Sequence, residues 1–181
     1  AQTVRVMPGT YTETVTMRDG VNVLGSGAAS TVISPGTAEW GVSCIGIGPG
    51  TLFGGFTITD GAVGIYCNSS SLAIRESAIT NIAAGDTSGD GIRLDDSSPL
   101  ISHNVIFHVG GMAIRGQGNS APRIINNTIY DYGYYAGISF AALNIGAVQP
   151  EIRNNIVVRG NSAPVGGVLW ILPASPIIGY N

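Results

Sequence analysis

Two arginines stand out in this 181-residue sequence as side chains whose type and spacing could do chemistry. Arg93 follows Gly91-Ile92, and Arg115 follows the equivalent pair Ala113-Ile114. A guanidinium group binds a carboxylate bidentately, so two guanidinium groups side by side would suit an acidic polymer such as a uronic-acid chain. Like charges directly opposite each other repel, so we expect compensation from Asp95, Asp96 or a bound anion. A solvated surface with aspartate partners is the alternative.

Carboxyl groups are the next candidates, because hydrolysis of a glycoside needs two of them ~5–9.5 Å apart. The sequence offers Asp86, Asp90, Asp95, Asp96 and Asp131. Adjacent carboxylates can separate each other's pKa values. However, Asp95 and Asp96 precede Ser97-Ser98-Pro99, where aspartate commonly makes local hydrogen bonds in a turn. A lyase would need a base, for which His103 and His108 are available, although a lone histidine is more often structural. The catalytic residues therefore stay unknown.

A repeated unit must position these residues. Gly91 to Ile106, GIRLDDSSPLISHNVI, predicts a short strand, a proline turn, a second strand, an asparagine turn and a third strand. Equivalent isoleucines recur about every two dozen residues, at Ile74, Ile101, Ile124, Ile152 and Ile178. Three places after each of them comes a second column, of Ser77, Asn104, Asn127, Asn155 and Asn181. Long helical stripes are absent, so the pattern indicates a solenoid with one coil per repeat. We interpret the asparagine column as a structural turn element, with a ligand site as the alternative.

The repeat, together with the opening VRVMPGTYTETVTMRDGVNVLGSG, resembles the right-handed parallel β-helix (pectin-lyase-like) superfamily in its parallel β-helix repeat form. The resemblance implies an all-β chain, folded as a single-stranded right-handed parallel β-helix with three short strands per coil. No linker or change in composition interrupts residues 1–181, so we expect one domain, which is either a fragment or an uncapped solenoid. In enzymes of this superfamily, the groove over the sheet of repeat-opening strands is the usual polysaccharide site.

The resemblance does not extend to a known catalytic motif. The NTD-type triplet, Gly-His-Gly and Arg-x-Lys of polygalacturonase-like enzymes are missing. The Asp-Pro-His element of alginate-epimerase-like enzymes and the DFIFG-type context of pectin-esterase-like enzymes are missing too. Because this architecture also serves adhesins and inert spacers, the fold does not decide the function.

Alternation along the repeat-opening strand predicts which side chains face out. The aliphatic residues Ile65, Ile92, Ile114, Ile138 and Val168 are expected to point inward, joined two places later by Cys67, Leu94, Phe140 and Trp170. Gly116 takes that second place in one coil and would leave room for Phe140 or Leu94. The outward and turn-facing set is Tyr66, Asn68, Arg93, Asp95, Arg115 and Gln117, here called the polar face.

A tyrosine-rich segment at residues 130–135 adds Tyr132 and Tyr134 to the predicted binding residues. Aromatic rings with a polar tip suit sugars, whereas packing over the edge of the coils is the alternative. The sequence thus predicts a polysaccharide-binding or carbohydrate-active module for an acidic or neutral glycan, without a complete catalytic site. The alternative is a structural, adhesin-like or passenger-like solenoid. Any enzymatic activity would be that of a polysaccharide lyase or a glycoside hydrolase.

The composition limits which kinds of binding partner this protein can have. A net charge of −3, with 8 basic and 11 acidic residues, argues against a nucleic-acid binder. No apolar run reaches the ~18 residues of a membrane span, and no cofactor motif or metal-ligand spacing is evident. We expect an extracellular, periplasmic or cell-surface location. Open strand edges at both ends predict self-association. Cys44 and Cys67 occupy one column in adjacent coils, as buried free thiols or as a disulfide.

Overall fold

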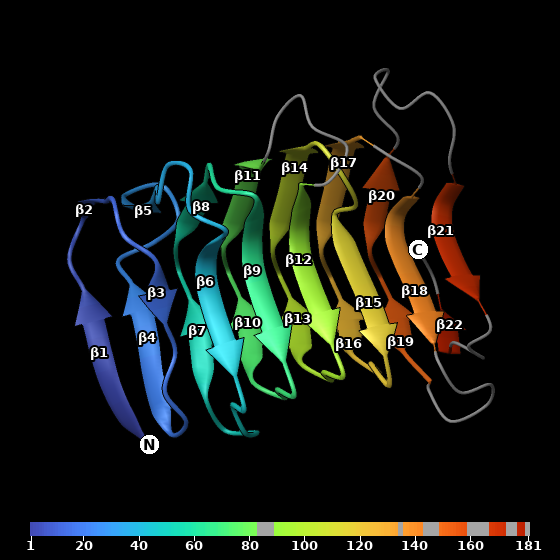
Figure 1. The fold of residues 1–181 in the computed structure, drawn as a ribbon, viewed down its shortest axis with the longest axis horizontal. Coiled ribbons are helices and arrows are strands. Elements are labelled where there is room, and N and C mark those ends of the chain that lie inside the picture. The colour runs from blue at the N-terminus through green and yellow to red at the C-terminus, as the bar shows by residue number, and fades with distance from the viewer. Residues whose placement is uncertain (83–88, 134–135, 143–148, 159–166, 173–176, 180–181) are drawn as a thin grey trace.

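The computed structural model describes residues 1–82, 89–133, 136–142, 149–158, 167–172 and 177–179. In these residues the chain winds as a solenoid of short strands, and no helix occurs in them (Figure 1). Each coil contributes one strand to each of three parallel sheets, here called A, B and C. The all-β, three-stranded coil predicted from the repeat is therefore confirmed. The described residues include no helix of the length and apolarity needed to cross a membrane.

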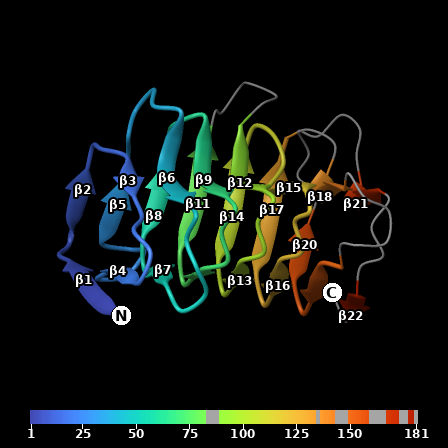
Figure 2. The same cartoon turned by 60° about the horizontal axis from the view of Figure 1, so that its bottom comes forward.

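The three sheets run side by side along the solenoid (Figure 2). Sheet A consists of β1 (Gln2–Val6), β4 (Val21–Gly25), β7 (Leu52–Gly54), β10 (Ala73–Arg75), β13 (Leu100–Ser102), β16 (Arg123–Ile125), β19 (Glu151–Arg153) and β22 (Ile177–Gly179). Sheet B consists of β2 (Gly9–Tyr11), β5 (Thr31–Ile33), β8 (Thr57–Thr59), β11 (Ala78–Ile82), β14 (Val105–Val109), β17 (Thr128–Tyr132) and β20 (Ile156–Val158). Sheet C, which holds the repeat-opening strands, consists of β3 (Val15–Thr16), β6 (Trp40–Ile45), β9 (Val63–Asn68), β12 (Asp90–Asp95), β15 (Ile114–Gly118), β18 (Ala136–Ala142) and β21 (Gly167–Leu172).

The register of the sheets follows the sequence repeat. Ile74 pairs with Ile101, Ile101 with Ile124, and the column continues to Ile178. Because each isoleucine of β10, β13 and β16 in this column is fully buried, the repeat builds one continuous apolar core along the axis. Hydrophobic burial of this kind is the main stabilising term for a chain with so few charged residues.

The corner between sheets A and B carries two polar columns. Glu76, His103, Asn126 and Asn154 adopt positive φ angles of 53°, 57°, 57° and 53°, which produce the sharp bend. The next residue in each coil, Ser77, Asn104, Asn127 or Asn155, turns its side chain into the interior and is buried.

The asparagine side chains of this corner bond backbone groups of neighbouring coils. The Asn127 Oδ1 accepts hydrogen bonds from the backbone N–H of Asn104 at 3.0 Å and from its Nδ2 at 3.1 Å. Asn155 Oδ1 receives the same two bonds from Asn127, both at 2.9 Å. Since Nδ2 of Asn127 also donates to the Ile101 carbonyl at 2.9 Å, each side chain satisfies backbone groups that the turn would leave unpaired.

One part of the predicted register is wrong by one residue. The sequence alignment places Val168 beside Ile138 and Trp170 beside Phe140. The structure pairs Ile138 with Leu169, and Phe140 with Ile171. The chain between β18 and β21 is longer than in other coils, so the Gly-aliphatic spacing alone did not define where the next strand begins.

The two cysteines lie level with each other on β6 and β9, as their spacing predicts. Both are fully buried and both are free thiols. The hydrogen bond with Cys44 and the burial of the site raise the pKa of the Cys67 thiol well above its usual value. Cys67 is therefore a neutral part of the core, not a reactive thiolate.

Candidate functional site

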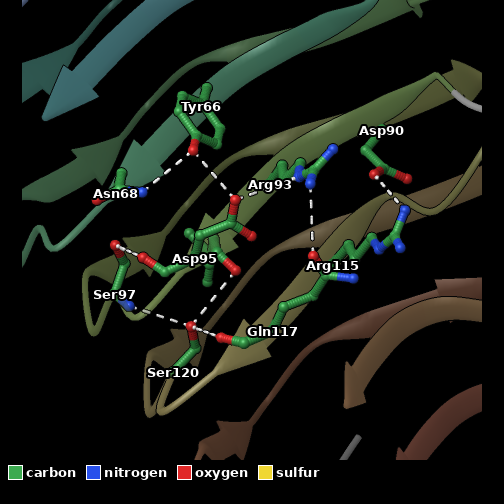
Figure 3. Close-up of polar contacts among 10 residues, drawn as sticks. Tyr66, Asn68, Asp90, Arg93, Asp95, Ser97, Arg115, Gln117 and Ser120 are labelled. Atoms are coloured by element: carbon green, nitrogen blue, oxygen red, sulfur yellow. Dashed lines mark hydrogen bonds and ion pairs between the residues drawn. The ribbon is translucent and has the colours of Figure 1, made fainter. Parts of the chain in front are cut away.

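The polar face is assembled by three adjacent strands of sheet C. Pairing of β9 with β12 places Tyr66 level with Arg93, and pairing of β12 with β15 places Arg93 level with Arg115. One step along the strands, Asn68, Asp95 and Gln117 form a second row. All six side chains are half-buried, and Figure 3 shows them gathered over the same three strands. The structure thus brings together six of the eight residues that the sequence predicted.

Buried neighbours fix the outward direction of these side chains. Ile65, Ile92 and Ile114 are fully buried in the core, so the residue that follows each must point out of the sheet. Gly116 faces the same core, and a Cβ atom there would overlap the ring of Phe140 in the next coil. The expectation that Gly116 leaves room for Phe140 is therefore confirmed.

Each arginine of the polar face has a carboxylate beside it. Arg93 Nε lies 3.6 Å from Asp95 Oδ2, and Arg115 Nη1 lies 3.4 Å from Asp90 Oδ2. The two arginine side chains are 36% and 35% exposed. The predicted compensation of the arginine pair by aspartate is thus present, with Asp90 in place of Asp96. Asp96 instead accepts the backbone N–H of Asn119 at 2.9 Å, which is a turn role.

Asp95 is the centre of a network of polar side chains. Its Oδ2 accepts a hydrogen bond from the Tyr66 hydroxyl at 3.1 Å, and that hydroxyl accepts one from Asn68 Nδ2 at 3.2 Å (Figure 3). The Gln117 amide can lie in two orientations. In one, its oxygen accepts from Arg93 Nη2 at 3.4 Å. In the reversed one, which we adopt because both amide atoms then have partners, it donates to Asp95 Oδ1 at 3.3 Å and accepts from Arg115 Nη2 at 2.7 Å.

Asp90 is a buried carboxylate at the start of β12. It is 3% exposed, and its Oδ1 accepts the backbone N–H of Met112 at 3.1 Å. Burial raises the pKa of Asp90, against the opposing effects of the Met112 hydrogen bond and the positive charge of Arg115. Gly111 is required here, because a Cβ atom would lie 2.9 Å from Asp90 Oδ1. Sequence reasoning identified Asp90 only as a candidate carboxyl group and missed its pairing with Arg115.

Sequence reasoning also missed an aromatic neighbour of the polar face. The Trp40 ring stacks on the Tyr66 ring, with centroids 4.6 Å apart and planes 16° apart. Trp40 and Asp90 occupy the same position of the repeat, because both are level with Val63. From this position Trp40 reaches Tyr66 of the next coil, and Asp90 reaches Arg115 of the next coil. An alignment of the strand starts could have revealed this shared position.

The candidate carboxylates of the described residues lie in different settings. Asp90 and Asp95 stand at opposite ends of β12, and five residues span ~16 Å of backbone along a strand. Their backbone positions are thus further apart than the ~5–9.5 Å between the two carboxyl groups of a glycosidase. Asp96 follows Asp95 but serves the turn. Asp131 lies on sheet B, where its Oδ2 is 2.9 Å from His108 Nε2. Asp86 falls outside the described residues.

The two histidines lie away from the polar face. His108 lies within β14 of sheet B. His103 Nε2 lies 3.3 Å from Asn126 Nδ2 at the corner of sheets A and B. Both histidines thus lie off sheet C, the sheet whose strands β12 and β15 carry Arg93 and Arg115. No group of three His, Cys, Asp or Glu side chains in the described part of the chain is arranged to hold a metal ion.

Tyr132 is a wrong prediction. It is the last residue of β17, and its side chain is 1% exposed within the hydrophobic core. Asp131 adopts a positive φ of 51°, which interrupts the alternation along β17. Tyr132 therefore points inward, level with the buried Val109 of the coil before it. Tyr134 lies outside the described residues. Tyr130, which is 36% exposed, stacks on Phe107 with ring centroids 5.0 Å apart.

Comparison with known proteins agrees with this geometry. Residues 40–169, well over half of the chain, match the family model described as a right handed beta helix region. The chain belongs to this family. No match was found among the curated proteins.

Two solved structures have the same fold. One is the catalytic unit of the thermostable GH87 α-1,3-glucanase from Streptomyces thermodiastaticus strain HF3-3, with a TM-score of 0.61, 18% identity, and coverage of 92% of this chain and 36% of that one. The other is a pectin methylesterase in complex with a hexasaccharide, with a TM-score of 0.57, 13% identity, and coverage of 93% and 61%. The chain therefore spans less than two thirds of either structure, and the likeness at these identities is one of fold.

Proposed function

We propose that this β-helix module binds a polysaccharide across strands β9, β12 and β15, at the polar face. The observation that carries the proposal is the in-register row of Tyr66, Arg93 and Arg115, held in place by their neighbours while the two arginines stay about one third exposed. Side chains that are already ordered lose little conformational entropy when a ligand binds. A polymer lying along the solenoid axis would meet a new coil every ~4.8 Å.

The chemistry of the polar face suits sugars. Arg93 and Arg115 supply planar N–H donors, and Asp95 supplies acceptor oxygens that a hydroxyl group can reach. Trp40 and Tyr66 add an apolar edge beside these groups. The fold shared with an α-1,3-glucanase and with a pectin methylesterase crystallised with a hexasaccharide supports a glycan as ligand. A module for such polymers would work outside the cytoplasm, in the periplasm or at the cell surface.

The proposal is tested by affinity electrophoresis through gels containing neutral or acidic polysaccharides. We expect Arg93→Ala plus Arg115→Ala to weaken retardation at least about tenfold in dissociation constant. The matched control is Arg123→Ala plus Arg153→Ala, which removes the same charge from sheet A, where the two side chains are 59% and 48% exposed. This control should bind as the original protein does.

Arg115→Lys separates binding from folding. Lysine keeps a positive charge beside the buried Asp90 but lacks the planar fork of arginine, so the fold should persist while binding falls. If the unaltered protein binds none of a broad panel of polysaccharides, the proposal is wrong and a structural solenoid becomes the better description.

A further inference from the structure

Together with the neighbouring Asp90, the polar face carries as many negative as positive charges. Arg93 and Arg115 are balanced by Asp95 and Asp90, which lie 3.6 Å and 3.4 Å from them. A guanidinium group that already faces a carboxylate has little remaining attraction for a second one. The arginine pair therefore does not form a positively charged surface.

Asp90 cannot turn away from this arrangement. An exposed aspartate could rotate into solvent when an anion arrives, but Asp90 is 3% exposed and accepts the Met112 N–H at 3.1 Å. Gly111 packs against the same carboxylate. The negative charge of Asp90 thus stays within 3.4 Å of the Arg115 guanidinium whatever the ligand.

Asp95 is held almost as firmly. Tyr66 donates to its Oδ2 at 3.1 Å, and Gln117 donates to its Oδ1 at 3.3 Å. A ligand carboxylate placed over Arg93 would face this carboxylate and meet repulsion. A neutral hydroxyl group can donate to Asp95 and accept from Arg93 in the same position.

From these contacts we infer that the polar face selects glycans without free carboxylates, and that Asp90 and Asp95 are the residues that exclude polyanions. The inference rests on the proposed function and narrows its substrate class. Neutral polysaccharides, including those whose uronic acids are esterified, present only hydroxyl and carbonyl groups to the face. These groups match the mixed donors and acceptors of Arg93, Asp95 and Gln117.

The test compares polymers that share a backbone and differ in charge. The probes are polygalacturonate with its fully methyl-esterified form, and a glucan with its carboxymethylated form, at constant low ionic strength. In at least one pair we expect the neutral member to bind the protein more tightly than the charged member. Asp90→Asn keeps an oxygen for the Met112 N–H and removes the charge, so binding of the charged member should rise about fivefold.

A matched control locates the effect. Glu151→Gln likewise removes an arginine-paired carboxylate, but on sheet A, where Glu151 pairs with Arg123 and Arg153. It should leave the preference unchanged. The same preference in Asp90→Asn as in the unaltered protein would overturn the role of Asp90, provided that circular dichroism shows the variant folded; Asp95→Asn then tests the second carboxylate in the same way.

The two proposals fail differently. If the charged members bind more tightly than the neutral ones, and Arg93→Ala plus Arg115→Ala abolishes this binding, the inferred exclusion is wrong while the polysaccharide site stands. If no member of either pair and no polysaccharide of the wider panel binds, the proposed function itself is wrong, and the inference falls with it.

Discussion

Two polar networks run along this solenoid, and they differ in what their side chains bond. The asparagine column at the corner of sheets A and B is 1% exposed, and its members bond backbone groups of adjacent coils. The polar face on sheet C is half-buried, and its members bond mainly each other's side chains. Repetition of a polar residue therefore does not indicate a binding site by itself. Its direction relative to the core decides whether it completes the backbone or remains available to a ligand.

The energetic consequence of this difference is large. A buried backbone group that loses its partner costs more free energy than a surface ion pair contributes. We therefore expect the asparagine column to control stability, and the polar face to control binding with small effects on stability. Five substitutions, two of them with a second variant as control or rescue, test the comparison in order of expected effect.

Asn127→Ala should lower the free energy of unfolding by about 3–5 kcal/mol, because it leaves the Asn104 N–H and the Ile101 carbonyl without their side-chain partner. Urea denaturation followed by circular dichroism measures the change. The neighbouring control is Asn126→Gly, which keeps the positive φ of 57° at an exposed position and should change stability by less than about 0.5 kcal/mol. Equal effects of the two substitutions would show that burial does not set the difference.

Gly116→Ala should destabilise the protein by about 1–3 kcal/mol, because the new methyl group overlaps the Phe140 ring. The same change should weaken glycan binding, since Arg115 and Gln117 flank residue 116 in β15. Thermal unfolding and affinity electrophoresis report the two effects. Phe140→Leu in the same chain should restore part of both losses, and an unchanged melting temperature for Gly116→Ala would contradict the packing.

Asp90→Asn should change how stability depends on pH. Burial raises the pKa of Asp90 in the folded protein, so its contribution to stability is fully present below the unfolded-state pKa and is lost as pH rises through the folded pKa. The stability of the original protein relative to Asp90→Asn should therefore fall between acidic and neutral pH. Urea denaturation at several pH values measures this trend. The charges that face Asp90 are those of Arg115 and Arg93, and both lower its pKa against the effect of burial.

Glu151 should show the opposite dependence of stability on pH. The hydrogen bond from Arg123 lowers the pKa of Glu151, so its contribution is present above the unfolded-state pKa and is lost as pH falls through the folded pKa. Relative to Glu151→Gln, the original protein should gain stability from acidic to neutral pH. A common trend for Asp90 and Glu151 would show that their surroundings do not differ as described.

Arg123→Ala should have the smallest effect. Its Nε lies 2.7 Å from Glu151 Oε2, but the side chain is 59% exposed, and Arg153 remains 3.0 Å from the same carboxylate. We expect less than about 1 kcal/mol in urea denaturation and no change in glycan binding. A larger loss of stability would mean that surface ion pairs, and not the buried columns, hold the coils in register.

Much of the molecule could be predicted from the spacing of a few residue types. Ile92 and Ile114 one coil apart indicated the inward column, and with it the outward positions of Arg93 and Arg115. The wrong assignments have two local causes. The positive φ of Asp131 reverses the alternation just before Tyr132. The register of β21 depends on where that strand begins after a connection of variable length, and a shift of one residue reverses the face of a strand.

The sequence by itself determined the coil, because a residue pattern that recurs every two dozen positions can bury its apolar side chains only by stacking. It also determined which side of sheet C carries the arginines, because alternation along a strand is a local property. Only the tertiary structure decided that Asp90 neutralises Arg115 and that Trp40 stacks on Tyr66. Those contacts join different coils through the lengths and directions of side chains, and a partner's direction depends on packing that no single repeat contains.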